Sequence, residues 1–190
     1  IQSKITEQTN VLILGNHGLV VAADSIEEAH ELLLDVHQRL IRSKREVTMP
    51  KSNFDIPAKS NYRAAKFFAQ GIAHDTISLE KVEKGSLYPD HVIFLGSGLQ
   101  LLNSSSTLDQ LERNQPDTLP KALIIHDQAV LVHKQASRGT DEMLLSLTEV
   151  GARLQPNDLV QKLTFKDEAE LLNWDAEKYR QDLARRNATA

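Results

Sequence analysis

Apolar and polar positions near the start of the chain fall in blocks. Residues 11–14 and 19–23 are apolar runs, and the polar residues 15–18 separate them. Short apolar runs bounded by turn formers predict two buried strands. From residue 26 onward apolar positions recur at helical spacing, which predicts a helix. These positions are Ile26, Ala29, Leu33, Val36 and Leu40.

Both ends of this predicted helix carry local signals. Ser25 and Glu28 have the spacing of a capping box, in which each side chain satisfies a free backbone N–H group of the first turn. The basic residues around 42–45 suit the negative end of a helix dipole. The chain therefore begins strand, turn, strand, helix, and the helix is expected to reach about residue 45.

The middle of the chain reads as a linker followed by shorter elements. Two prolines and several turn formers mark the linker between residues 49 and 61. The hydrophobic pattern after it predicts four elements. They are helices over 62–72 and 78–84, a strand over 91–95 and a helix over 104–113.

Residues 122–132 repeat the opening pattern. They form an apolar run, a short polar turn and a second apolar run, and a helix with one apolar face follows. Aligned on residues 11–40, the strands match without a gap and the helices match after a small insertion. We interpret this as a degenerate internal repeat, with chance similarity of two β-β-α units as the alternative. The tail, 157–186, is predicted to be helical, with Trp174 and Tyr179 packing back onto the domain.

These elements predict an α/β fold made of two related β-β-α units. Successive strands are joined by hairpins, so we expect a three-layer αβα arrangement with a mixed or antiparallel sheet. The linker divides the chain into an incomplete segment, 1–52, and a second α/β domain, 53–190. The first segment should expose an unpaired sheet edge. We therefore expect pairing with a missing N-terminal part of the same protein, or a homo-oligomer.

Composition excludes several classes of protein. The net charge of −4 and the lack of a basic run argue against nucleic-acid binding. No apolar stretch has the roughly 20 residues of a membrane span. The absence of cysteine excludes disulfides and thiolate zinc ligands, and no secretory signal is visible, so we expect a cytoplasmic protein.

The first turn holds the best candidate chemistry, at His17. Gly15 and Gly18 can let the backbone approach a ligand or adopt positive φ, and Asn16 can adopt the left-handed conformation or bind a ligand. A polar turn at the end of a buried strand is also where α/β folds tend to place their sites. The structural alternative is that His17 is simply a hydrogen-bonded turn residue.

The residues from Gly15 to Val21, with Asp24 and the following helix opening, resemble the C-terminal part of the class II aldolase/adducin domain. Residues 88–93, the second β-β-α unit and the segment 173–175 resemble the extension that follows this domain in longer members. The resemblance implies a class II aldolase-like fold. No Gly-x-Gly-x-x-Gly motif follows a strand, so no dehydrogenase is expected.

The resemblance also implies a metal centre. In catalytic members this His is one of three imidazoles on a divalent metal, usually zinc, which stabilises an enediolate when a carbon–carbon bond breaks. In those members the other two imidazoles come from a His-x-His pair earlier in the domain, and an acidic catalytic residue lies upstream of that pair. This chain contains no His-x-His pair, so His17 is the one metal ligand that can be carried over. Gly15, Asn16 and Gly18 would lie against the substrate, a small sugar phosphate or a keto or hydroxy acid.

Other histidines do not replace the missing ligands. His30 and His37 are seven residues apart, about 10 Å along a helix, too far to share an ion, and are expected to lie on a partly buried face. His126 and His133 could at most form a pair. We expect a structural role for His91 at the start of a strand, and we expect His74 to lie in solvent.

The second turn places Asp127, Gln128 and Ala129 where the first has Asn16, His17 and Gly18. Glutamine is a poor zinc ligand, so the second unit should keep the scaffold without the metal. An alternative is that His126 and Asp127 bind a different polar ligand.

Three functions follow. The intact protein would be a metal-dependent carbon–carbon lyase, of which this chain alone is inactive. The second possibility is a non-catalytic, adducin-like scaffold. The third is that residues 53–190 form a regulatory or oligomerisation module, or a second substrate-binding lobe.

Overall fold

The computed structural model describes residues 5–49, 54–83, 85–115, 118–175 and 179. The chain divides into two compact units, unit 1 (Ile1–Ser43) and unit 2 (Lys44–Ala190). This boundary precedes the one expected from the linker, at residues 52 and 53. The reason is that the chain joins unit 2 at once: the Arg45 N–H donates to the Ala152 carbonyl at 2.7 Å.

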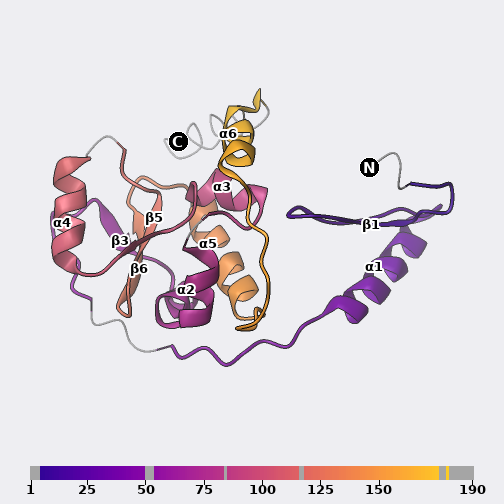
Figure 1. Cartoon of the computed structure of the whole chain (residues 1–190), viewed down its shortest axis with the longest axis horizontal. Helices are drawn as coiled ribbons and strands as arrows, with labels where there is room; N and C mark the ends of the chain where they lie inside the picture. The colour runs from indigo at the N-terminus through magenta and orange to yellow at the C-terminus, as the bar shows by residue number, and fades with distance from the viewer. Residues whose placement is uncertain (1–4, 50–53, 84, 116–117, 176–178, 180–190) are drawn as a thin grey trace. The chain divides into compact units, whose positions relative to one another are not determined.

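Unit 1 is a β-hairpin followed by one helix (Figure 1). Strands β1 (Val11–Leu14) and β2 (Gly18–Val21) pair antiparallel, and α1 (Ile26–Leu40) follows. The Ser25 hydroxyl accepts the Glu28 N–H at 3.1 Å, as the capping pattern predicted. The helix ends at Leu40, so the expectation that the basic residues 42–45 form its last turn is wrong.

Unit 2 is built on a four-stranded mixed sheet. Its strands are β3 (Tyr62–Ala64), β4 (Gln100–Leu102), β5 (Ala122–Ile125) and β6 (Ala129–His133), in the order β3-β6-β5-β4. Strand β4 runs parallel to β5, and the other pairs are antiparallel. Apart from His133, every residue of β5 and β6 is buried, because the hairpin has a strand on each side and helices on both faces.

Helices cover the two faces of this sheet, so unit 2 has three layers (Figure 1). On one face, α4 (Ser105–Asn114) packs Leu108 and Leu111 against Leu123 and Ile125. The other face is covered by four helical segments. They are the 3₁₀ helix η2 (Phe67–His74), α2 (Thr76–Val82), α3 (Pro89–Leu95) and α5 (Arg138–Gly151). Mixed α/β architecture is confirmed.

Two predicted elements of unit 2 are wrong. The strand expected over 91–95 is helix α3, because Pro89 occupies a first-turn position and Tyr88 before it is extended. The helix expected over 62–72 is replaced by β3 and η2. A short apolar run is compatible with a strand or with a buried helix, and only packing decides between them.

The second β-β-α unit reproduces the first in its backbone. Val11 pairs with Val21 and Leu14 with Gly18; at the equivalent positions Ala122 pairs with Val132 and Ile125 with Ala129. A serine precedes each helix, and α5 begins one residue later than exact alignment would place it. The predicted gap-free strands and small insertion are confirmed.

The C-terminal helix is shorter than predicted. Helix α6 (Phe165–Asn173) packs against α3, and the preceding residues 157–164 are not helical. Trp174 and Tyr179 are 60% and 66% exposed, so the expectation that they pack onto the domain is wrong. The rest of the predicted tail helix lies outside the described residues. Among the helices described, none is long and apolar enough to cross a membrane.

Candidate functional site

The β1–β2 turn presents His17 at the end of the hairpin. The His17 N–H donates to the Leu14 carbonyl at 3.1 Å and closes the turn. Asn16 has φ 57°, the left-handed conformation that its sequence suggested. The His17 side chain is exposed, so the hydrogen bond that fixes the turn is made by its backbone and leaves the imidazole accessible to a ligand.

The two glycines of this turn differ in what they contribute. Gly18 has φ 145°, a conformation that residues with a side chain rarely adopt. Gly15 is not in that region, and a Cβ placed on either glycine would meet open space. Conformation therefore explains Gly18, whereas only the close approach of a ligand would require glycine at position 15.

The described residues do not form a complete metal site. Within the described ranges, no three His, Asp or Glu side chains are grouped to hold an ion. His17 is therefore a single candidate ligand. His30 and His37 are both exposed on α1, so the expectation that they lie on a partly buried face is wrong.

The equivalent turn of unit 2 matches the first at its left-handed residue and at its closing hydrogen bond, but Ala129 lacks the positive φ of Gly18. Asp127 has φ 54°, and the Gln128 N–H donates to the Ile125 carbonyl at 3.0 Å. The backbone of this second turn is also hydrogen-bonded to other elements of unit 2. The Asp127 N–H donates to the Ala73 carbonyl at 3.1 Å, and the His126 N–H donates to the Leu102 carbonyl at 2.9 Å. This turn therefore anchors the hairpin to η2 and β4.

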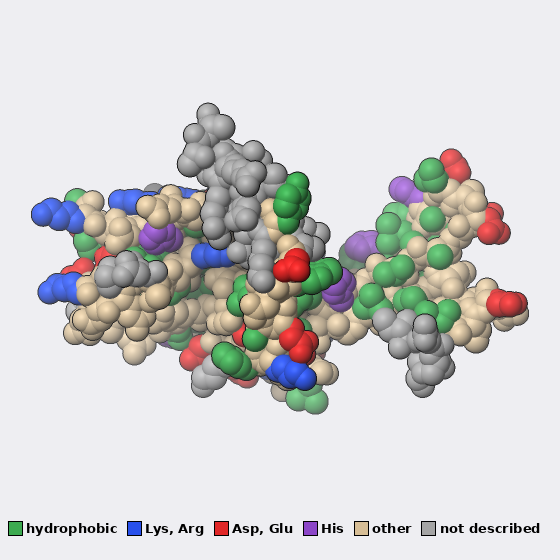
Figure 2. Space-filling model, turned by 90° about the horizontal axis from the view of Figure 1, so that it is seen from above, with side chains coloured by type: hydrophobic (Ala, Val, Ile, Leu, Met, Phe, Trp, Pro, Cys, Tyr) green, Lys and Arg blue, Asp and Glu red, His purple; other side chains and the backbone are tan. Residues whose placement is uncertain are grey.

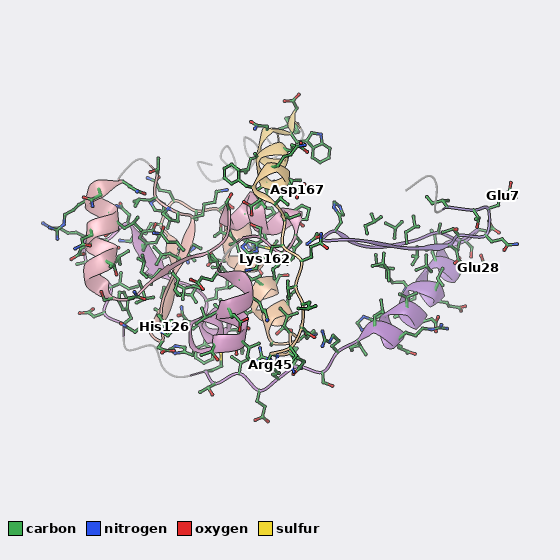
Figure 3. The ribbon with its side chains drawn as sticks, viewed as in Figure 1. Glu7, Glu28, Arg45, His126, Lys162 and Asp167 are labelled. Atoms are coloured by element: carbon green, nitrogen blue, oxygen red, sulfur yellow. The ribbon has the colours of Figure 1, made fainter. Side chains whose placement is uncertain are left out.

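The side chains of His126 and Asp127 contact each other in the second turn. His126 Nδ1 lies 3.1 Å from an Asp127 carboxylate oxygen, and both side chains are substantially exposed. Figure 3 labels His126 at the tip of the hairpin. His133 lies at the other end of β6, where its ring packs edge-on against Tyr62 at 5.4 Å. The structure therefore does not bring the two histidines together.

His91 has the structural role expected for it, although in a helix. It is fully buried, and its Nδ1 accepts the Leu87 N–H at 3.3 Å. Burial lowers the pKa of its imidazole to about 4, so the ring is neutral near pH 7. His74 was expected in solvent, and this is wrong for its Nε2 atom, which is buried without a hydrogen-bond partner among the described residues.

A polar cluster that the sequence did not reveal surrounds Arg45 (Figure 3). Its guanidinium makes two hydrogen bonds to Asp75, at 2.9 and 2.6 Å, and caps the end of α5 by donating to the Gly151 carbonyl at 2.9 Å. Burial favours the neutral Asp75 carboxyl, but hydrogen bonds from Arg45 and Ser78 outweigh burial and lower its pKa. The cluster attaches the start of unit 2 and is structural. Because its partners are far apart in sequence, no local pattern indicates it.

Comparison with protein-family models, with curated proteins and with solved structures gave no match for this chain. The site is therefore defined by the chain's own residues. It consists of the exposed imidazole of His17, which follows the left-handed residue Asn16. The equivalent position in unit 2 is Gln128.

Proposed function

We propose that the chain is part of a metal-dependent carbon–carbon lyase, in which the β1–β2 turn supplies His17 as one ligand of a divalent metal, with zinc the first choice. The substrate would be a small sugar phosphate or a keto or hydroxy acid. Gly15, Asn16 and Gly18 would lie beside it. The resemblance implies two further imidazole ligands and an acidic catalytic residue, which would come from outside this chain, so this chain alone would be inactive.

The main support for this proposal is the contrast between two turns that share a left-handed residue and a closing hydrogen bond. In unit 1 the imidazole of His17 is exposed and the neighbouring Gly15 leaves open space. In unit 2 the equivalent turn has Gln128 and is bound into the fold. The turn of unit 2 therefore keeps the left-handed residue but has glutamine in place of the candidate ligand. This is what we expect if the two units share a scaffold and unit 1 alone binds the metal. The resemblance of residues 11–42 to the aldolase/adducin domain supplies the reaction class.

The test is retro-aldol cleavage by the full-length protein on a panel of sugar phosphates with added zinc. His17→Ala should lower kcat/KM by more than about a hundredfold, since losing an outer-shell partner of a ligand already costs 10–100-fold. Gln128→Ala changes the equivalent turn of unit 2 and should leave turnover unchanged. The 190-residue chain should show no turnover. Zinc-dependent activity of this chain by itself, or an active His17→Ala protein, would contradict the proposal.

A second candidate function, assembly without catalysis, is favoured by the surface of unit 1. Several large apolar side chains there are exposed, among them Ile13, Val20 and Leu33. Exposed apolar surface on a small unit is typical of interaction sites. An adducin-like scaffold would keep that surface and bind no metal, so metal analysis separates the two functions.

A further inference from the structure

Within the described part of the chain, no further strand pairs with the β1–β2 hairpin, whereas the equivalent hairpin of unit 2 has a strand on each side. In unit 2 the outer edge of β6 pairs with β3 and that of β5 pairs with β4, whereas the described sheet of unit 1 has two strands only. Ile13 is 67% exposed and Val20 45%, but the equivalent Ile124 and Leu131 are at most 1% exposed. Figure 2 shows apolar side chains gathered on the surface of unit 1. Two strands and one helix leave this sheet marginally stable by itself.

The edges of this hairpin are unprotected. Strands β1 and β2 contain only apolar residues and one glycine. Exposed edge strands that do not pair with another chain usually carry charged residues or proline, which oppose the addition of a further strand. Because neither strand has a charge, two copies of the hairpin could approach without like-charge repulsion between the paired strands.

Hydrogen bonding identifies which backbone groups of β2 face outward. The Ala22 N–H donates across the hairpin to the Asn10 carbonyl at 2.9 Å. Hydrogen-bonded pairs alternate along an antiparallel ladder, so the N–H and C=O groups of Leu19 and Val21 point away from β1. In unit 2 the residue equivalent to Leu19 is Val130, and its carbonyl accepts the Ala65 N–H at 2.9 Å on that same outer side.

Two-fold symmetry is compatible with a second copy at the outer edge of β2. A two-fold axis perpendicular to a sheet pairs identical strands antiparallel. The outer edge of β6 takes an antiparallel strand, whereas that of β5 takes a parallel one. Since β2 corresponds to β6, an antiparallel second copy at the outer edge of β2 would repeat a strand pairing that unit 2 already contains.

We propose that a second copy of this chain occupies the outer edge of β2, so that two hairpins form one four-stranded antiparallel sheet. Opposite residues must point to the same face, and the outward groups must meet. Both conditions hold when Val20 lies on the two-fold axis opposite Val20 of the second copy. Leu19 then faces Val21 of the other copy, and all four outward groups of each strand are hydrogen-bonded. The pairing does not depend on a metal at His17.

Sedimentation equilibrium of the 190-residue chain over a wide concentration range tests the pairing. The wild type should form a dimer. Val20→Lys should be monomeric wherever the wild type is dimeric, because two like charges would face each other across the axis. Ile13→Lys places the same charge at a more exposed position on β1 and should remain dimeric. Circular dichroism of each variant checks that it is folded.

A single cysteine tests the register. The chain contains no Cys. At a non-hydrogen-bonded pair the Cα atoms are about 4.5 Å apart, within the range of a disulfide. Val20→Cys should therefore give a disulfide-linked dimer under mild oxidation, and Ile13→Cys should give much less. A wild type that is monomeric throughout overturns the proposal. So does a dimer that survives Val20→Lys, or equal cross-linking of the two cysteine variants.

Discussion

At the scale of single residues, burial separates the histidines of this chain into different roles. His17 is exposed on a turn that its backbone holds, so its imidazole is accessible to a metal or a substrate. His91 is fully buried in α3 and accepts the Leu87 N–H. Burial keeps its imidazole neutral in the folded chain. The stability of the fold should therefore decrease in acid, where the unfolded chain protonates this histidine.

His91 predicts a loss of stability on acidification. Its pKa is about 4 in the folded chain and near 6.5 when unfolded, so between these values the unfolded state binds more protons. The stability contributed by neutral His91 is full above pH 6.5 and falls as the pH decreases to about 4. The shift corresponds to about 3 kcal/mol. Urea unfolding across this pH window measures it.

The control for this prediction is His91→Asn, which keeps an acceptor near the Nδ1 position but does not titrate there. This variant should be less stable at neutral pH because it packs less well. Its unfolding free energy should nevertheless change less between pH 6.5 and 4 than that of the wild type. Equal pH dependence of the two proteins would mean that groups other than His91 cause the acid sensitivity.

Among the elements, the two hairpins show that equivalent side chains contribute differently to stability when different strands and helices surround them. Their registers agree, but β5–β6 lies inside a four-stranded sheet and β1–β2 forms a two-stranded one. Burial of a strand on both faces requires neighbours that the strand's own sequence does not encode. The stabilising contribution of each hairpin therefore depends on what packs around it.

Matched truncations of the two hairpins should differ in cost. Ile124→Ala removes a side chain that is buried in unit 2 and should destabilise that unit by about 2–5 kcal/mol, through lost burial and the cavity left behind. Ile13→Ala removes its exposed counterpart and should cost less than about 1 kcal/mol. Amide hydrogen exchange, measured separately for β5 and β1, reports both values. Similar costs would show that unit 1 buries Ile13 in solution.

Elements with strong local patterns could be predicted from the sequence, and those defined by long-range contacts could not. The hairpins, α1 and the helix after Ser104 follow from apolar runs, spacing and caps. Strands β3 and β4 have three residues each and exist because they pair with β6 and β5. The short apolar run of α3 is compatible with a strand or a helix, which is why the sequence pattern predicts a strand there. At the candidate site, the left-handed turn at Asn16 was predictable, whereas the Arg45 cluster was not.

At the scale of the whole molecule, the chain combines two versions of one β-β-α design. Unit 2 surrounds its copy with strands and helices and uses the turn for anchoring. Unit 1 leaves its copy open, with an exposed His17 at the turn and an uncharged edge on β2. We infer that unit 1 is the interacting part of the molecule, through a ligand at its turn and a second copy at its edge.

If His17 is a metal ligand, as we propose, the zinc content of the full-length protein depends on its imidazole. Wild type, His17→Ala and the matched Gln128→Ala protein should be purified without chelators, loaded with zinc, dialysed, and measured by elemental analysis. The wild type and Gln128→Ala should retain the same zinc per chain, and His17→Ala should lose it. Equal zinc in the wild type and His17→Ala would show that His17 is not a metal ligand.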